Sequence, residues 1–149
     1  MKLQILVPQY KETDEVVKSL LDSLLIQQNV DFNEFGVIIV NDGTDVQLSE
    51  KLLSSYPYRI DYYKAPHRGV SATRNTCLDY ATADYVMFCD ADDMFYNACG
   101  LYLIFREINI GFDTLSSKFI EEGVDKNGNH IYINRDNDST FVHGKVHRR

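Results

Sequence analysis

The sequence contains few or none of several residue types, and the small number and the spacing of its cysteines are the most informative of these features. Its 149 residues include no tryptophan, three prolines and three cysteines. Cys77, Cys89 and Cys99 form no CxxC pair and no spacing typical of a zinc site. We therefore expect free thiols in a reducing compartment, and a cytoplasmic protein. Eight phenylalanines and ten tyrosines still provide ample aromatic side chains for the core of one compact domain.

Long hydrophobic runs are also missing. Gln4 and the Pro8-Gln9 pair interrupt the apolar start of the chain, which leaves it too short for the apolar region of a signal peptide. No later apolar run, such as residues 37–40, exceeds five residues, whereas a membrane-spanning helix needs about 20 apolar residues. We expect no transmembrane segment.

Positive charge is scarce. Fifteen lysines and arginines stand against 22 aspartates and glutamates, for a net charge of −7. A protein that binds nucleic acid needs a basic surface to displace counterions from the phosphates, and the only basic cluster lies at residues 145–149. We therefore expect no nucleic-acid partner. A nucleotide ligand is still possible, because a metal ion can supply the positive charge.

Short β-branched runs alternate with helical patterns over residues 1–110. Strands are expected at residues 3–7, 37–40, 60–64 and 85–89, with the first ended by Pro8. Helices are expected at residues 46–55, 70–83 and 97–108, and in a segment capped by Thr13 whose apolar stripe comprises Val16, Val17, Leu20, Leu21, Leu24 and Leu25. This rhythm predicts an α/β domain, Rossmann-like, with a mostly parallel sheet and helices on both faces.

The remainder, residues 111–149, has a different pattern. Segments 114–122 and 130–134 flank residues 125–129, and the Asn127-Gly128 pair there favours a tight turn. A last short strand is expected at residues 140–142. We interpret residues 1–149 as a single domain, in which 1–110 bind a nucleotide and 111–149 form a C-terminal β-hairpin and the start of an acceptor-side part.

Polar clusters follow all four predicted strands. They are residues 8–12, 41–43, 67–69 and 90–93. Ligands of an open parallel sheet bind outside the carboxyl ends of its strands, so these clusters mark one candidate site.

The acidic cluster Asp90-Ala91-Asp92-Asp93 carries the sharpest signal. Three carboxylates within four residues raise each other's pKa unless a cation neutralises them. Carboxylate oxygens suit Mg²⁺ or Mn²⁺, which also bind substrate phosphates. The alternative is a solvated turn in which Asp93 caps a helix.

Two other residues are weaker candidates when each is taken alone. Asp42 follows four aliphatic residues and could accept a hydrogen bond from a base or a ribose, or could form a simple turn with Gly43. Arg74 lies near the start of a helix rich in small residues, where it could reach a phosphate or be an ordinary surface arginine.

Taken together, these segments resemble the family 2 glycosyltransferases of the GT-A fold. The resemblance covers residues 3–96, with Pro8, Tyr10 and Glu12 after the first strand and an Asn41-Asp42-Gly43-Thr44 turn after the second. It continues with Gly69-Val70-Ser71-Ala72-Thr73-Arg74-Asn75 and with Asp90-Ala91-Asp92-Asp93.

The resemblance implies a site for the nucleotide sugar, lined by Pro8, Tyr10, Glu12, Asp42, Arg74, Asp90 and Ala91. In it Asp42 faces the base, while Asp90 and Asp92 meet the metal on the diphosphate. It also implies that His143 and Gly144, within residues 141–146, lie on the acceptor side. Asn41 departs from the family's usual acid. The family's acidic general base normally lies well after the acceptor segment, so we expect it outside this chain; Glu121 and Glu122 lack the right context.

The expected reaction is a metal-dependent, inverting transfer of a sugar from a nucleoside-diphosphate sugar, with a UDP-sugar favoured, to a hydroxyl of an unknown glycan, lipid or protein. The cofactor would be Mn²⁺ or Mg²⁺. One alternative is a non-catalytic or hydrolysis-only module that binds the nucleotide sugar. Another is an aspartyl phosphatase of the haloacid-dehalogenase type, but its acidic loop usually follows the first strand and has Thr or Val where Met94 stands here. A dinucleotide dehydrogenase is weaker still, because no GxGxxG follows the first strand.

Overall fold

The computed structural model describes residues 1–111, 114–124 and 130–143. Its elements, in chain order, are β1 (Leu3–Gln9), α1 (Asp14–Leu25), β2 (Phe35–Asp42), α2 (Glu50–Leu53), β3 (Arg59–Ala65), α3 (Val70–Tyr80), β4 (Tyr85–Phe88), α4 (Gly100–Ile110), β5 (Thr114–Val124) and β6 (His130–His143). None of the helices in these residues has the length and apolar character to cross a membrane.

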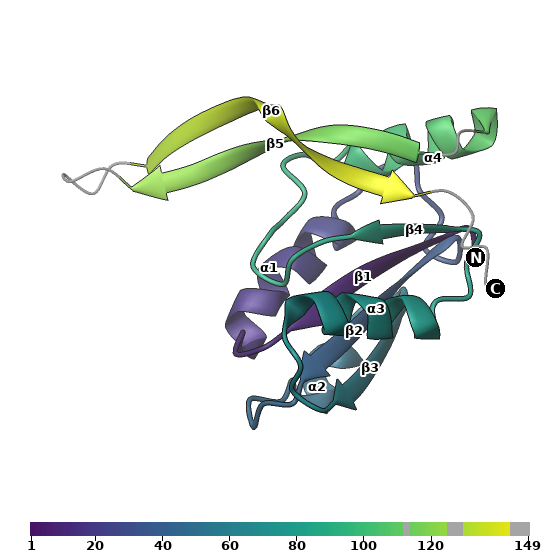
Figure 1. Ribbon diagram of the computed structural model, residues 1–149. Helices are drawn as coiled ribbons and strands as arrows, with labels where there is room; N and C mark the ends of the chain where they lie inside the picture. The colour runs from purple at the N-terminus through teal and green to yellow at the C-terminus, as the bar shows by residue number, and fades with distance from the viewer. Residues whose placement is uncertain (112–113, 125–129, 144–149) are drawn as a thin grey trace.

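A single sheet organises the molecule, with the strand order β3-β2-β1-β4-β6-β5. Strands β1 to β4 are parallel, and β6 pairs antiparallel with both β4 and β5. Helix α3 lies across one face of β1 and β2 and α1 covers the other (Figure 1). The predicted α/β class, with a mostly parallel sheet and helices on both faces, is confirmed.

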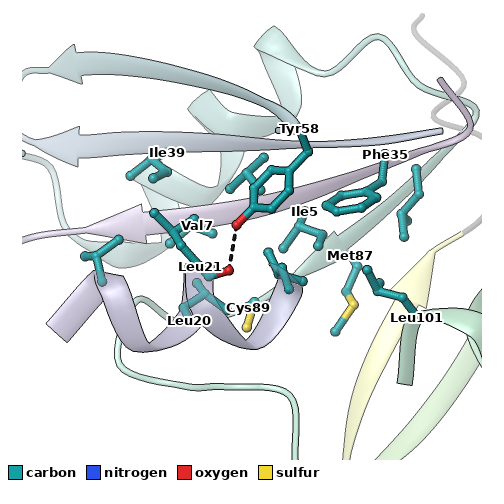
Figure 2. Packing of buried hydrophobic residues seen from close by; sticks show 14 of the residues in the cluster. Ile5, Val7, Leu20, Leu21, Phe35, Ile39, Tyr58, Met87, Cys89 and Leu101 are labelled. Atoms are coloured by element: carbon teal, nitrogen blue, oxygen red, sulfur yellow. Dashed lines mark hydrogen bonds between the residues drawn. The ribbon is translucent and has the colours of Figure 1, made fainter. Parts of the chain in front are cut away.

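Most of the core lies on the face covered by α1 and α4. Alternate residues of β1 and β2, such as Ile5 and Ile39, pack there against Leu20, Leu21 and Leu101 (Figure 2). The buried Tyr58 closes the edge of this cluster, and its hydroxyl donates a hydrogen bond to the Leu21 carbonyl at 2.6 Å. The hydrophobic cluster on the other face of the sheet is smaller and comprises Leu6, Ile38, Val40, Cys77, Ala81 and Val86. Because β1 and β2 are covered on both faces, both are apolar nearly throughout.

Strand β1 passes through Pro8, where the sequence predicted its end. The Leu6 carbonyl accepts a hydrogen bond from the Cys89 N–H, on the β4 side of the strand. Pro8, two residues later, directs its nitrogen to the same side, where β4 has already ended at Phe88. The missing N–H therefore costs no ladder hydrogen bond, and β1 reaches Gln9.

The apolar stripe of α1 is narrower than predicted. Val17, Leu20, Leu21 and Leu24 are buried, whereas Val16 and Leu25 lie at the edges of the stripe and are exposed. Thr13 occupies the N-cap position as expected, but its side chain makes no capping hydrogen bond.

Side-chain hydrogen bonds shorten two helices relative to the prediction. Helix α2 starts only at Glu50, because the Ser49 hydroxyl caps it and the Val46 carbonyl accepts hydrogen bonds from the side-chain amides of Gln9 and Asn41. Helix α3 ends at Tyr80, because the N–H groups of residues 82 and 83 donate to the Gln4 side chain at 2.6 and 2.8 Å. Helix α4 is shifted by about one turn at its start and reaches Ile110.

The two segments after residue 113 form the long antiparallel pair β5 and β6 (Figure 1). The strands predicted at 130–134 and 140–142 are the two ends of the single strand β6, and each end pairs with a different half of β5 across an irregularity between Lys118 and Ile120. The Asn-Gly turn predicted at 125–129 lies outside the described residues, so the turn itself stays a prediction.

Candidate functional site

A cavity of about 320 Å³ lies at the carboxyl edge of the parallel strands. This volume is at the lower end of the range for small-molecule sites, roughly 300–1,000 Å³. Its lining comprises Pro8, Gln9, Tyr10, Glu12, Asp42, His67, Gly69, Val70, Thr73, Asp90, Ala91 and Asp92. Each of the four polar clusters that follow the strands contributes to it.

The position of the cavity follows from the strand order. The chain builds the sheet from β1 through β2 to β3 on one side and then returns to place β4 on the other side of β1. The order therefore reverses between β1 and β4, and loops after these strands diverge to opposite faces. Residues 8–12, at the end of β1 and in the loop after it, and residues 90–92 after β4 flank this crevice.

The structure brings together most of the residues predicted for the nucleotide-sugar site. Pro8, Tyr10, Glu12, Asp42, Asp90, Ala91 and Asp92 all line the cavity. Arg74 does not line it, but its guanidinium group pairs with Asp90 Oδ1 at 2.5 Å and lies 5.9 Å from the centre of the Phe88 ring. Their roles toward a ligand stay predictions.

The two predicted acceptor-side residues lie differently. The backbone of His143 pairs with Val86, near the start of β4, whereas the cavity lies beyond the end of that strand. Gly144 lies outside the described residues. Glu121 and Glu122 belong to β5, as expected for residues of the C-terminal strands. The acceptor-side assignment stays a prediction.

Asp42 forms a clamp between β2 and the start of α3. Its Oδ1 accepts the Arg68 N–H at 2.9 Å, and its Oδ2 accepts the Gly69 N–H at 3.0 Å. His67 Nδ1 lies 2.9 Å from Oδ2 and 3.1 Å from the Asp42 carbonyl oxygen. Because both of these partners are acceptors, Nδ1 carries the proton and donates it. The Asp42 side chain is only 6% exposed, so these hydrogen bonds replace nearly all of its contact with water.

These contacts determine the charge state of Asp42. Burial raises its pKa, but the hydrogen bonds, with the one from the Arg68 backbone the strongest, lower it further than burial raises it. The net result is a pKa below the ordinary value for aspartate. Asp42 is therefore a buried carboxylate that remains ionised at neutral pH.

Gly43 allows the turn after β2 to lie directly against the loop after β3. It has φ of +73°, and a Cβ added there would lie 2.4 Å from the His67 backbone nitrogen. The turn after β2 and the loop after β3 are thus in direct backbone contact. This close approach explains why Asp42 can bind backbone groups of residues 68 and 69.

Asn41 stands where the resembled family has an acid, and the structure gives it a clear role. Its side chain donates to the Val46 carbonyl at 2.7 Å and accepts the Thr44 N–H at 2.8 Å. The Tyr62 hydroxyl lies 3.2 Å from the same amide. Asn41 is fully buried, so a donor and an acceptor are both needed here, and a carboxylate, which only accepts, could not supply both.

Glu12 and Tyr10 shape the loop after β1. Glu12 Oε2 accepts the Tyr10 N–H at 2.7 Å, and the buried Gln9 amide donates to the Glu12 carbonyl at 2.9 Å. The Tyr10 ring stacks on the His67 ring, with centroids 4.9 Å apart and planes inclined by 23°. The stacked rings of Tyr10 and His67 thus form part of the cavity wall, next to the hydrogen bonds of Asp42.

Within the acidic cluster, Asp93 has the raised pKa that three neighbouring carboxylates predict. Loss of hydration and repulsion from Asp90 and Asp92 together raise the pKa of Asp93. The alternative in which Asp93 caps a helix is wrong, because α4 begins only at Gly100, with Cys99 in the N-cap position. Among the described residues, no group of three His, Cys, Asp or Glu side chains is placed to hold a metal ion.

Sequence reasoning assigned no role to several residues that line the cavity: Gln9, His67, Gly69, Val70 and Thr73. His67 belonged to the recognised cluster after the third strand, and that position was the available signal. Its contacts with Tyr10 and Asp42 join residues 57 and 25 positions apart in the chain, which no local pattern reveals.

Comparison with known proteins assigns the chain to a family. The model of the family described as "Glycosyl transferase family 2" matches residues 4–139, which is most of the chain. The chain belongs to glycosyl transferase family 2. An uncharacterized glycosyltransferase of Rickettsia bellii is 30% identical over 126 residues, which cover 82% of this chain and 18% of that protein.

Solved structures of glycosyltransferases have the same fold. The structure of S. aureus TarS residues 1–349 in complex with UDP-GlcNAc has a TM-score of 0.66 and 26% identity, covering 76% of this chain and 33% of that one. A mannosyltransferase from Pyrobaculum calidifontis, solved with GDP-Man and Mn²⁺, has a TM-score of 0.57 at 20% identity, covering 67% and 30%. The chain has a GT-A glycosyltransferase fold and thus spans about a third or less of the length of these proteins.

Proposed function

We propose that this chain is the donor-binding part of a family 2 glycosyltransferase that is metal-dependent and inverting. The sugar would pass from a nucleoside-diphosphate sugar, with a UDP-sugar favoured, to a hydroxyl of a glycan, lipid or protein. The cavity carries the proposal: a buried carboxylate, Asp42, lies at one part of its wall, and Asp90 and Asp92 lie at another.

The nucleoside would occupy the part of the cavity lined by Pro8, Tyr10, Glu12 and Asp42. An ionised carboxylate accepts hydrogen bonds and donates none, so Asp42 favours a base that presents a ring N–H. Uracil has such a group. The likeness to TarS, whose structure was solved with UDP-GlcNAc and with UDP, supports the same choice.

The diphosphate would lie near the acidic cluster. Two exposed carboxylates fit Mg²⁺ or Mn²⁺, since these ions are often held by one or two carboxylates together with substrate phosphates and water. Asp90 and Asp92 are the residues proposed to hold the ion. When bound, the ion would supply Lewis-acid stabilisation of the charge that develops on the leaving diphosphate.

At the diphosphate end of the cavity, the protein itself contributes a positioned positive charge. Arg74 pairs with Asp90 and packs on the Phe88 ring, so its guanidinium group is held at the margin of the cavity. From there it can donate to a phosphate oxygen without leaving its place on α3. Ala91, small and buried, lets the backbone between the two carboxylates line the cavity.

The general base remains unassigned within this chain. Among the carboxylates that line the cavity, Asp42 is occupied by hydrogen bonds and Glu12 accepts the Tyr10 N–H, while Asp90 and Asp92 are proposed for the metal. This observation favours a second candidate function, a module that binds the nucleotide sugar and only hydrolyses it or does not react. Loss of one positioned base typically costs ~10²–10⁴-fold in rate.

Thermal unfolding against a panel of nucleotide sugars, with and without Mn²⁺, tests the donor site. A ligand at 100 times its Kd stabilises the folded state by about 2.7 kcal/mol, which raises the Tm of a domain of this size by roughly 5–10 °C. We expect the largest shift with a UDP-sugar and Mn²⁺. Asp92→Asn should abolish the dependence on Mn²⁺ and leave the fold intact, because its side chain is exposed.

The absence of a metal-dependent shift with any donor would contradict the proposal. A radiolabelled transfer assay then separates its two forms. Formation of a glycoside by this chain supports the transferase, whereas release of free sugar, or binding without turnover, supports the second candidate.

A further inference from the structure

His67 makes two contacts in the cavity that a bound base would also need. Its ring stacks on Tyr10 with centroids 4.9 Å apart, and its Nδ1 donates to Asp42 Oδ2 at 2.9 Å. An imidazole is a flat ring with a ring N–H, as is a pyrimidine with an N–H group. His67 therefore presents the same two features, in the same place, that the proposed function requires of the base.

Of the groups that bind the Asp42 carboxylate, the His67 side chain is the one that a ligand can replace most easily. Two donors are the backbone N–H groups of Arg68 and Gly69, and these are fixed because residue 67 lies directly against Gly43 and α3 begins at Val70. A further donor, the Thr73 side chain, is buried on α3 with only 2% of the residue exposed. The His67 side chain, in contrast, is 58% exposed and can rotate into solvent. A ligand N–H can reach Oδ2 most easily by replacing His67 Nδ1.

The stacking of His67 on Tyr10 likewise requires that a bound base replace the His67 ring. Stacked or edge-on aromatic rings have centroids about 4.5–7 Å apart, so the 4.9 Å between Tyr10 and His67 is a single stacking distance. A third ring has no room between them. A base that stacks on this face of Tyr10 must displace the His67 ring.

We propose that His67 occupies the base subsite in the ligand-free protein and leaves it when the nucleotide binds. This inference rests on the proposed function, because it assumes a nucleoside beside Tyr10 and Asp42. His67 then determines nucleotide affinity by competition. It keeps the Asp42 carboxylate paired while the subsite is empty, and it weakens the binding of every base that must displace it.

The size of the effect follows from the population of the open state. When only a fraction of the molecules can accept ligand, the observed Kd is the intrinsic Kd divided by that fraction. If His67 closes the subsite in about 90% of molecules, its removal tightens nucleotide binding about tenfold. A ligand without a base should gain nothing.

Calorimetric titration with two ligands tests this proposal. UDP and inorganic pyrophosphate, each with Mn²⁺, are titrated into the wild-type chain and into His67→Ala. We expect UDP to bind about 3- to 10-fold more tightly to the variant and pyrophosphate to bind equally to both. Lys64→Ala is the control: this residue is an exposed cation three positions earlier, on β3, outside the cavity lining, and it should change neither affinity.

NMR of the imidazole groups provides the second readout. The His67 ring signals, assigned by their loss in His67→Ala, should move when UDP binds, because the ring leaves the Tyr10 stack and the Asp42 hydrogen bond. Pyrophosphate with Mg²⁺ should leave them in place. For this measurement UDP is also used with Mg²⁺, since Mn²⁺ broadens the signals.

Three results would overturn the inference. Weaker or unchanged UDP binding in His67→Ala shows that His67 supports the base or ignores it, and in that case the proposed function stands. If pyrophosphate gains as much affinity as UDP in His67→Ala, the effect of His67 does not depend on the base. If neither protein binds UDP with metal, the proposed function fails and the inference fails with it.

Discussion

Asp42 is the residue on which both the architecture of the site and its proposed chemistry depend. Its carboxylate is nearly buried and holds the loop after β3 against the turn after β2. A carboxylate can accept all of these donors, whereas an amide must direct an N–H group at one of them. The same atoms that assemble the cavity are therefore those proposed to select the ligand.

We predict that Asp42→Asn destabilises the chain by about 1–3 kcal/mol at pH 7, because a buried N–H loses its acceptor. Urea-induced unfolding followed by circular dichroism measures this change. Asp45→Asn is a matched control, because the Asp45 side chain is fully exposed and lies 4.0 Å from Lys64. We expect it to change stability by less than about 0.5 kcal/mol. Equal effects of the two substitutions would contradict the clamp.

The pH dependence of the Asp42 effect has a definite sign. The folded pKa of Asp42 lies below that of the unfolded chain, about 3.9, so the carboxylate contributes its full stabilisation above that pH. The contribution is lost as the pH falls through the lower folded pKa. The stability difference between the wild type and Asp42→Asn should therefore be constant from pH 6 to 7 and shrink below about pH 4. A difference that grows in acid would refute this assignment.

Asn41→Asp is expected to be costly although the two residues are nearly the same size. The carboxylate cannot donate to the Val46 carbonyl or to Tyr62, and it adds a charge to a fully buried position. We predict a loss of about 2–4 kcal/mol in the free energy of unfolding, from an unsatisfied acceptor and a buried charge. The same substitution at the exposed Asn75 of α3 serves as the control and should have little effect in the same urea titration.

At the scale of the elements, the contact between two loops shapes the cavity. Gly43→Ala should cost about 2–4 kcal/mol, because it combines a positive φ with a backbone clash against His67. Gly111→Ala separates the two causes, since Gly111 also has a positive φ, of 84°, but has nothing within 4 Å of an added Cβ. There we expect only about 1–2 kcal/mol, from conformation alone. Melting temperatures of the two variants test the difference, and equal shifts would mean that the clash is relieved elsewhere.

Most elements were predictable because their signals are local. The alternation of apolar runs and helical stripes identifies β1 to β4 and the four helices. Their ends were less predictable, since they depend on partners far along the chain. Gln4 terminates α3 through residues 82 and 83, and the Val46 carbonyl, bound by Gln9 and Asn41, is unavailable to α2. Strand β1 continues through Pro8 because the neighbouring strand is shorter.

At the scale of the molecule, burial is concentrated around β1 and β2, which are covered on both faces. Strand β3 is an edge strand whose residues are exposed or only partly buried. We predict that amide hydrogens at the centre of β1, around Ile5 and Leu6, exchange only through global unfolding, whereas those of β3 exchange through smaller openings. Hydrogen exchange followed by NMR measures both. Similar protection in the two strands would contradict this gradient.

The chemical parts of the site were evident from the chain alone. Parallel strands of an α/β domain present their carboxyl ends at one edge, so polar residues after four such strands had to lie near one another. That geometry predicted Asp42, Asp90 and Asp92 as neighbours, and the cavity contains all three. Local sequence determines such residues because it places each one a fixed number of positions after its strand.

Only the tertiary structure decided how those residues are used. Asp42 has three partners from the loop after β3, Arg74 pairs with Asp90, and His67 stacks on Tyr10. None of these contacts has a period or a motif, because each joins loops that follow different strands and meet only when the sheet is assembled. The sequence by itself determined that Asp42, Asp90 and Asp92 follow neighbouring strands and so meet at one edge of the sheet. The packing of the loops determined which other residues join them and which of these groups already have partners.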